Sequence, residues 1–447
     1  MKTPIYDFVK KYAESDMTRM HMPGHKGKGT LGIEKLDITE ITGADVLYSA
    51  DGIISESQRN AAKLFGTAAT FYSTEGSTLA IKAMLALVHT ENRKNRKTLI
   101  LAQRNAHKAF INAAALLDLE VEWMYHDAVS EHICSCVISA DSVKKRLSLL
   151  SELPDAVYIT SPDYLGNIAD VAGISSVCDS FGIPLLVDNA HGAYLNFLDT
   201  SAHPIALGAS MCCDSAHKTL PVITGGAYLH VAKKASRYVD RAASIMSLFA
   251  STSPSYLIMQ SLDLCNDILD SSYRTDLMRT VDRLNTHKSR IFEFGFEFSK
   301  SEALKLVINA KRFGYTGADL AEHLQEYMIE PEFVDEDYVV LMASTSTTER
   351  DFVRIETAFG TLKTKKPILQ TNNYNITPHK RGLSIRDAVF SPTQKLPVHE
   401  AVGRICAAPT VSCPPAIPIV VSGEIIEEGD VELFFKYGKT DISVVSE

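Results

Sequence analysis

Short apolar runs rich in β-branched residues alternate with longer helical patterns between residues 56 and 232. The runs are TLILA (98–102), VEWMY (121–125), AVYIT (156–160), PLLVD (184–188), ASMCC (209–213) and GAYLHV (226–231). Strands that are apolar on both faces and separated by helices form a parallel, or nearly parallel, sheet with helices on both sides. The sequence therefore predicts a three-layer α/β domain.

The chain downstream of this pattern divides into smaller parts. Residues 236–300 are mainly helical, and two apolar runs, KLVINA and DYVVLMA, bracket helical segments in residues 304–360. A Pro- and Asn-rich stretch over residues 363–382 is typical of a linker. We therefore predict an N-terminal arm (1–50), a large α/β domain (51–265), a smaller α+β domain (266–368) and a C-terminal α+β segment (369–447).

Composition restricts the classes of partner and compartment. Lys and Arg number 45 against 54 Asp and Glu, which gives a net charge of −9 without a compensating basic stripe. Nucleic acid is therefore not expected as a partner. No apolar stretch approaches the ~20 residues that span a bilayer, and the N-terminus lacks the apolar run of a signal peptide. We expect a cytoplasmic protein with no membrane partner, whose eight cysteines are reduced and mostly buried.

Polar residues follow the strands at the points where the strands end. In open α/β sheets ligands bind at the carboxyl ends of the strands, so these residues are where chemistry is expected. Each segment alone could be a loop or a helix cap, but five at strand ends favour a functional site. The segments are Glu75-Gly76-Ser77-Thr78, Asn105-Ala106-His107, Ser161-Pro162-Asp163, Asp188-Asn189-Ala190-His191 and Asp214-Ser215-Ala216-His217-Lys218.

The segment STEGSTLAIKAMLALV (73–88) places a glycine and two hydroxyl residues at the start of an amphipathic helix. Free backbone N–H groups and the helix dipole at such an end bind phosphate. An ordinary N-cap has the same residues, and taken alone this segment favours the cap.

Asp188 ends an apolar strand, and we expect Lys218, 30 residues further on, to lie at the end of the strand after next. A buried carboxylate needs a cationic partner. A lysine that forms a Schiff base, an aspartate that pairs with the pyridinium nitrogen and hydroxyls that hold a phosphate together make a pyridoxal phosphate (PLP) site. Taken alone, Asp188 is more simply explained by a structural salt bridge, and Lys218 by a salt bridge or by an exposed position on the surface.

Several motifs resemble the Orn/Lys/Arg decarboxylase family of fold-type-I PLP enzymes. The motifs are HMPGHK (21–26), RNAHK (104–108), YITSPDYLGNIADV (158–171), VDNAHGAYL (187–195) and SAHKTLPVITGGAYLH (215–230). The resemblance covers nearly the whole chain, and the Ser-x-His-Lys element is its most specific part. Because longer family members carry an N-terminal wing domain and this chain begins almost at MPGHK, it resembles the short form.

The resemblance implies a role for each matching residue. Lys218 would carry the cofactor, Asp188 would pair with its ring nitrogen, and His107 would stack on the ring, with Ala190 against the opposite face. His217 or Lys218 would return a proton to the substrate carbon. The remaining cofactor-binding residues would be Gly76, Ser77, Thr78, His191 and Ser215, with His217 also closing the phosphate loop. His21 and His25 are spaced like metal ligands, but Pro23-Gly24 forbids the helix of a two-histidine zinc site, and no metal is expected.

Departures from the family pattern lie downstream. A polar Thr-Gln element after the lysine is replaced by Ile223-Thr224-Gly225-Gly226, and a glutamate and a tyrosine near the C-terminus are replaced by Ala408 and Cys413. A distal substrate cation requires an acidic partner, for which Asp163 is the first choice and Glu424 the second. Other acidic candidates are Glu40, Asp45 and Asp51.

The sequence thus predicts PLP-dependent decarboxylation of arginine, lysine or ornithine, as in polyamine biosynthesis. Arginine is placed slightly ahead because a planar guanidinium suits a carboxylate fork. An aminotransferase or lyase on the same fold shares every cofactor residue and stays open, as does a PLP-binding protein without turnover. A homodimer is expected, with the MPGHK arm reaching across to the neighbouring subunit.

Overall fold

The computed structural model describes residues 1–92, 95–127, 132–369, 377–408 and 416–446. The chain forms two compact units, one of residues 1–93 and 178–277 and the other of residues 94–177 and 278–447. Each unit is discontinuous in sequence. The four consecutive domains expected from the sequence stay predictions.

The first unit begins with helices that pack on one another. Helix α1 (Pro4–Glu14) packs against α2 (Ile53–Phe65) and α9 (Tyr256–Ser271). Asp263 on α9 anchors α1, because its Oδ2 accepts hydrogen bonds from the Ile5 and Tyr6 N–H groups at 2.8 and 3.0 Å. Burial raises the pKa of Asp263 to about 6.

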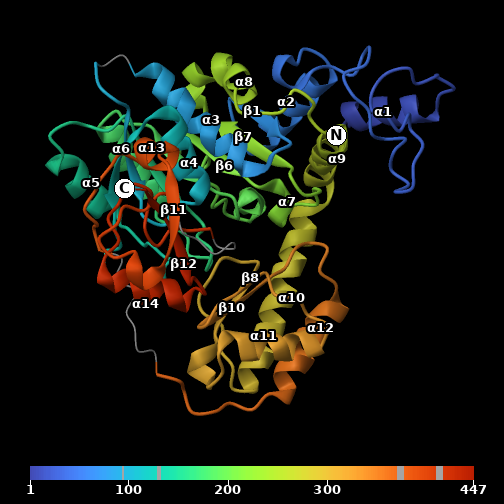
Figure 1. Cartoon of the computed structure of the whole chain (residues 1–447). Helices are drawn as coiled ribbons and strands as arrows, with labels where there is room; N and C mark the ends of the chain where they lie inside the picture. Colours follow the sequence, from blue (N-terminus) through green and yellow to red (C-terminus); the bar gives the residue numbers. More distant parts are fainter. Residues whose placement is uncertain (93–94, 128–131, 370–376, 409–415, 447) are drawn as a thin grey trace. The chain divides into compact units, whose positions relative to one another are not determined.

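The strands of the first unit run in the order β1 (Ala69–Ser73), β7 (Ala227–Val231), β6 (Met211–Asp214) and β5 (Leu185–Asp188). Helices α2, α3 (Gly76–Glu91) and α8 (Val239–Ser247) pack on them (Figure 1). β5 and β6 are parallel, whereas β7 is antiparallel to both β1 and β6. The sheet that the sequence predicts to be parallel, or nearly parallel, thus includes an antiparallel strand. The connection from β6 to β7 holds only the single turn of α7 (Ala216–Thr219), which cannot return the chain to the opposite end of the sheet.

The second unit contains the parallel strands β2 (Leu99–Gln103), β3 (Glu120–Met124) and β4 (Ala156–Thr160), with β2 between the other two. Helices α4 (Lys108–Leu117) and α5 (Ala140–Leu149) belong to the same unit. The boundary between the units falls within α6 (Val171–Ser180) and at α10 (Tyr273–Glu293). All six strands predicted from apolar runs in the α/β region are present.

The remainder of the second unit has two smaller sheets. β8 (Lys305–Asn309), β10 (Tyr338–Met342) and β9 (Phe333–Val334) form an antiparallel sheet. It shares an apolar core with α10, α11 (Gly317–Glu326) and α12 (Glu349–Thr361). Helix α13 (Ile385–Phe390), the antiparallel pair β11 (Thr393–Pro397) and β12 (Asp441–Val445), and α14 (Glu428–Lys436) follow. Short 3-10 helices span Leu47–Ser49, Ala193–Phe197, Lys233–Tyr238, Ala310–Phe313 and Val398–Glu400.

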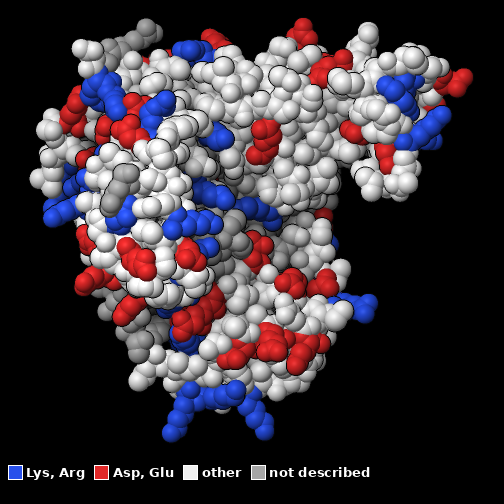
Figure 2. All heavy atoms as spheres, viewed as in Figure 1, with Lys and Arg blue, Asp and Glu red and all other residues white. Residues whose placement is uncertain are grey.

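The surface carries charges of both signs. Positive and negative side chains are interspersed on the face shown in Figure 2. Within the described residues, no helix combines the length and the apolar character needed to cross a membrane. Every cysteine described is a free, buried thiol, as predicted, and Cys413 lies outside the described residues.

Candidate active site

The N-terminus of α3 and two hydroxyl groups lie together in the first unit. Gly76 begins α3 with φ +68°, and a methyl group added there would meet no atom within 4 Å. The Ser215 hydroxyl, at the start of α7, donates to the Ser77 hydroxyl at 2.8 Å. Thr78 is half-buried in the same turn as Ser77. The open space beside Gly76 and the convergent hydroxyls fit a phosphate group.

Glycine is required where the loop before β7 meets this turn. The Gly76 N–H donates to the Gly225 carbonyl at 2.8 Å. Gly225 has φ +99°, and a Cβ there would lie 3.0 Å from the Thr74 carbonyl oxygen. The Gly225-Gly226 pair that departs from the family pattern therefore lets the loop approach the turn at Thr74 and Gly76 closely.

Lys218 lies on α7, directly after β6, and its Nζ is 3.0 Å from His191 Nε2. His191 follows β5 and is buried, whereas Lys218 is half-buried. His217, the preceding residue, has its Nδ1 2.9 Å from the Gly226 carbonyl oxygen. The two strand ends thus bring the predicted lysine beside a predicted cofactor residue.

Asp188 is the last residue of β5 and is 2% exposed. Its Oδ1 accepts hydrogen bonds from the Ala190 N–H at 3.2 Å and from the Cys213 thiol at 3.4 Å. These two donors hold the carboxyl group in place at the end of the strand. A buried carboxyl group of this kind is suited to pair with a cationic ring nitrogen.

A buried network supports this strand end and was not predicted from the sequence. Asp214 Oδ2 is 2.9 Å from His203 Nε2 and 3.2 Å from His230 Nε2. Asp214 Oδ1 accepts from Asn189 Nδ2 at 2.6 Å. Burial alone would raise the pKa of Asp214, but the two histidines outweigh burial and hold that pKa well below its usual range.

The same three side chains are close enough to share a metal ion, but hydrogen bonds already account for their ligand atoms. His203 Nδ1 accepts from the Ile205 N–H, so its Nε2 donates to Asp214. His230 Nδ1 bonds the Thr70 hydroxyl. The network fixes Asn189, and through it the backbone that follows Asp188.

Three predicted residues belong to the second unit. His107 caps α4, where its Nδ1 accepts from the Ala109 N–H at 3.1 Å. Asp163 is 3% exposed, and its two oxygens accept from Asn167 N and Nδ2 at 2.9 and 2.7 Å. Burial raises the pKa of Asp163 to about 6.

Glu424, the third of these residues, is engaged within the protein. Its Oε2 lies 3.3 Å from Arg104 Nη2 and accepts from the Val421 N–H at 2.7 Å. Arg104 is itself buried and donates to the Pro418 and Ile419 carbonyls. The carboxylate of Glu424 is thus neutralised by an arginine, which weakens it as a partner for a substrate cation.

The arm residues that were candidates have local partners. His25 Nε2 lies 3.2 Å from Asp37, while His21 Nε2 lies 2.6 Å from the Tyr12 hydroxyl, so the two histidines do not share a site. Asp45 accepts from the backbone N–H groups of Val46, Asp51, Gly52, Ile54 and Ser55. Asp45 therefore organises the turn before α2.

The first-unit residues meet the demands of PLP. They offer an open oxyanion cradle, a lysine amine and a buried carboxylate on neighbouring strand ends. The nine predicted residues in this unit are Gly76, Ser77, Thr78, Asp188, Ala190, His191, Ser215, His217 and Lys218. Their individual roles stay predictions.

Two family models match the chain. One, described as Orn/Lys/Arg decarboxylase, major domain, matches residues 3–310, and the other, the C-terminal domain of the same family, matches residues 363–440. An arginine decarboxylase of Bacillus subtilis is 30% identical over 97% of this chain and 93% of its own. An arginine decarboxylase of Halalkalibacterium halodurans is 29% identical over 96% and 92%. A lysine decarboxylase structure from Francisella novicida superimposes with a TM-score of 0.80 at 16% identity, covering 99% of this chain and 81% of that one.

Proposed function

The chain belongs to the Orn/Lys/Arg decarboxylase family, and from that premise we propose that it decarboxylates a basic amino acid, arginine ahead of lysine and ornithine. The family is PLP-dependent and has the fold-type-I fold, as the sequence predicted. The observation that carries the proposal is the convergence of Lys218, Asp188 and the Ser77–Ser215 cradle on adjoining strand ends. The test is a comparison of kcat/KM for arginine, lysine and ornithine, with each amine product identified.

We propose that different residues bind different parts of PLP. Gly76, Ser77 and Ser215 would bind the phosphate, and Lys218 would carry the cofactor covalently. When bound, PLP supplies an electron sink for the pair left on Cα as CO2 departs. Asp188 would keep the ring nitrogen protonated, since a unit charge pair at 4 Å is worth about 4 kcal/mol at an effective dielectric of 20, before desolvation.

The remaining residues would orient the substrate and deliver a proton. His107 would cover one face of the ring, and Ala190 would leave room on the other. Because Nδ1 of His217 bonds the Gly226 carbonyl, any proton that His217 delivers leaves from Nε2. Lys218, beside His191, is the alternative donor. Orientation selects which Cα bond lies perpendicular to the ring and hence which bond breaks.

For the substrate cation, we retain Asp163 as the proposed partner. Replacing it by alanine or asparagine is expected to raise the KM for arginine about 10- to 100-fold, which corresponds to the roughly 1.5–3 kcal/mol of a hydrogen bond to a charged group. PLP affinity should change less than about twofold, because the cofactor residues are untouched. Asparagine retains the size of the side chain, so it separates charge from packing.

The pH dependence gives a second readout for Asp163. With its pKa raised to about 6, the carboxyl is ionised at neutral pH and becomes neutral as the pH falls through that value. The KM should therefore rise below pH 6 in the wild type and stay flat in the asparagine variant. Asp141→Ala, which removes an exposed carboxylate on α5, is the matched control. Unchanged kinetics in both Asp163 variants would refute this partner.

We also propose a homodimer. The arm exposes an unusual number of apolar side chains, with Met20 86% and Leu31 79% exposed. Exposed apolar surface of this kind marks an interaction site. Light scattering should give about twice the chain mass of 49.1 kDa. Met20→Asp with Leu31→Asp should dissociate the dimer, while Leu149→Asp, at a position on α5 that is 70% exposed, should not. A fully active wild-type monomer would overturn this proposal.

The chemistry of the product indicates the pathway that we propose, and the free thiols indicate the compartment. An amine derived from arginine, lysine or ornithine would serve polyamine biosynthesis. Free cysteines, which the described part of the chain retains, are typical of a reducing compartment, so we propose the cytoplasm.

A further inference from the structure

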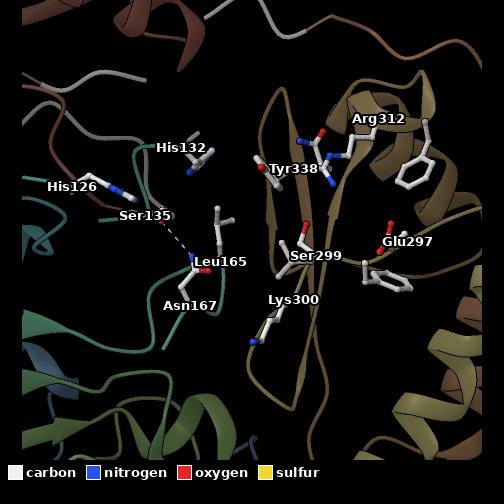
Figure 3. Close-up of a pocket in the computed structure, with 14 residues that line it drawn as sticks. His126, His132, Ser135, Leu165, Asn167, Glu297, Ser299, Lys300, Arg312 and Tyr338 are labelled. Carbon is white, nitrogen blue, oxygen red and sulfur yellow. Dashed lines mark hydrogen bonds between the residues drawn. The ribbon is translucent and has the colours of Figure 1, made fainter. Parts of the chain in front are cut away.

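A cavity of about 460 Å³ lies within the second unit. One wall comes from the segments after β3 and β4 and includes His126, Leu165 and Asn167, which lie together on one side of Figure 3. The opposite wall comes from residues 297–313 and β10 and includes Arg312 and Tyr338. None of its lining residues is a predicted cofactor residue, and its one direct link to the proposed chemistry is Asn167, which bonds the carboxyl group of Asp163.

A buried amide in this wall lacks a donor. Asn309, the last residue of β8, is 3% exposed and lines the cavity. Its Oδ1 has no hydrogen-bond partner among the described residues. Leaving a buried acceptor unsatisfied costs about 1–3 kcal/mol, so the position favours a ligand that brings an N–H group to it.

Two cationic side chains at the cavity also lack an ion pair with a carboxylate of the described residues. Arg312 and Lys300 are exposed, and neither forms an ion pair with a described residue. Other lysines of the same region are paired. Lys311 lies 2.6 Å from Glu336 and 2.8 Å from Asp337, and the buried Lys305 lies 3.0 Å from Glu302. The cavity therefore offers positive charge to an incoming anion.

The wall also carries an acidic group and an apolar surface. Glu297 is exposed and has no ion-pair partner among the described residues. Phe298, Phe313 and Val307 contribute apolar surface to the same lining. The complement of these features is a small molecule with a carboxylate, a donating ammonium and an apolar stem.

We propose that this cavity is a binding site for a free α-amino acid, separate from the PLP chemistry. The carboxylate would bind Arg312, whose planar fork suits it, with Lys300 nearby. The ammonium would donate to Asn309 Oδ1 and face Glu297. The apolar stem would lie against Phe298 and Phe313. Although Asn167 of this cavity bonds Asp163, the contacts proposed for the α-carboxylate and the ammonium do not involve Asp163.

Isothermal titration calorimetry on the PLP-loaded protein tests this site. The protein is first treated with borohydride, which reduces the bond between PLP and Lys218 and closes the catalytic site to amino acids. The probes are L-arginine, L-glutamate, agmatine (arginine without its carboxylate) and inorganic phosphate. We expect one of the two amino acids to bind once per chain, and agmatine not to bind.

The variants assign any binding to the cavity. Arg312→Gln should weaken the amino acid about 10-fold or more, as loss of a charge-assisted contact predicts. Lys300→Gln, at an exposed position, should weaken it less, and Arg350→Gln, an exposed arginine on α12, should have no effect. Absence of amino-acid binding would overturn the proposal. Binding that Arg312→Gln leaves unchanged would do the same, and so would Arg312-dependent binding of phosphate alone.

Discussion

Replacing Lys218 by alanine is expected to abolish decarboxylation, by at least ~1,000-fold or about 4 kcal/mol of activation free energy. The visible absorbance band of the purified holoenzyme should vanish as well, because an alanine cannot hold PLP covalently. The Lys218 amine lies on α7, directly after β6, at 3.0 Å from His191 Nε2. Absorbance spectra and CO2 release measure the two effects on the same sample.

The matched control for that variant is Lys233→Ala, which removes an exposed lysine just after β7. It should leave both the spectrum and the rate unchanged. Circular dichroism of Lys218→Ala should match the wild type, since the half-buried amine makes a small contribution to packing. A Lys218→Ala protein that keeps the visible band would show that another group carries the cofactor.

Asp188→Asn is expected to retain part of the bound PLP and to lose about 100- to 1,000-fold in kcat. An amide cannot offset a pyridinium charge, so the ring nitrogen would no longer stay protonated. The loss corresponds to about 3–4 kcal/mol, similar to the charge pair estimated at an effective dielectric of 20. Single-turnover rates with PLP in excess separate this effect from weaker binding of the cofactor.

The asparagine at position 188 preserves the shape of the buried site. The hydrogen bond from the Ala190 N–H can still be accepted by the amide oxygen. Asp199→Asn, at an exposed position in the same unit, is the matched control and should retain full activity. A wild-type kcat in Asp188→Asn would remove Asp188 from the mechanism.

Much of the fold could be predicted because apolar strands and helices alternate strongly. The runs at 156–160 and 184–188 coincide with β4 and β5 to within one residue. The direction of β7 could not be predicted, because an apolar run has the same pattern in either direction. The β1 strand was also missed, since its half-buried Ala69–Ser73 lacks a continuous apolar pattern.

The candidate site also contains residues that the sequence could predict and residues that it could not. Lys218, Asp188 and the Ser77 turn are carried by local motifs, so the sequence indicates them directly. The network of Asp214, His203 and His230 draws on three separated segments, and a pattern along the chain does not reveal it. Asn309 is similar, because its unsatisfied oxygen is a property of tertiary packing.

The acidic residues were the hardest to assign. Asp163 and Glu424 are equivalent as carboxylates in sequence, and the structure distinguishes them by their partners. Glu424 meets Arg104, whereas the carboxyl group of Asp163 meets the neutral Asn167 and its carbonyl oxygen accepts from Lys305 at 3.1 Å. An ion pair across more than 300 positions of the chain is invisible to local reasoning.

Measuring the products from L-arginine labelled with ¹³C in its carboxylate tests the central claim most directly. Purified protein with PLP should release one labelled CO2 and one agmatine for each arginine consumed, and the Lys218→Ala protein should release neither. An aminotransferase would instead retain the label in a keto acid, and a binding protein without turnover would leave arginine intact. Either outcome, found also with lysine and ornithine, would contradict decarboxylation of a basic amino acid.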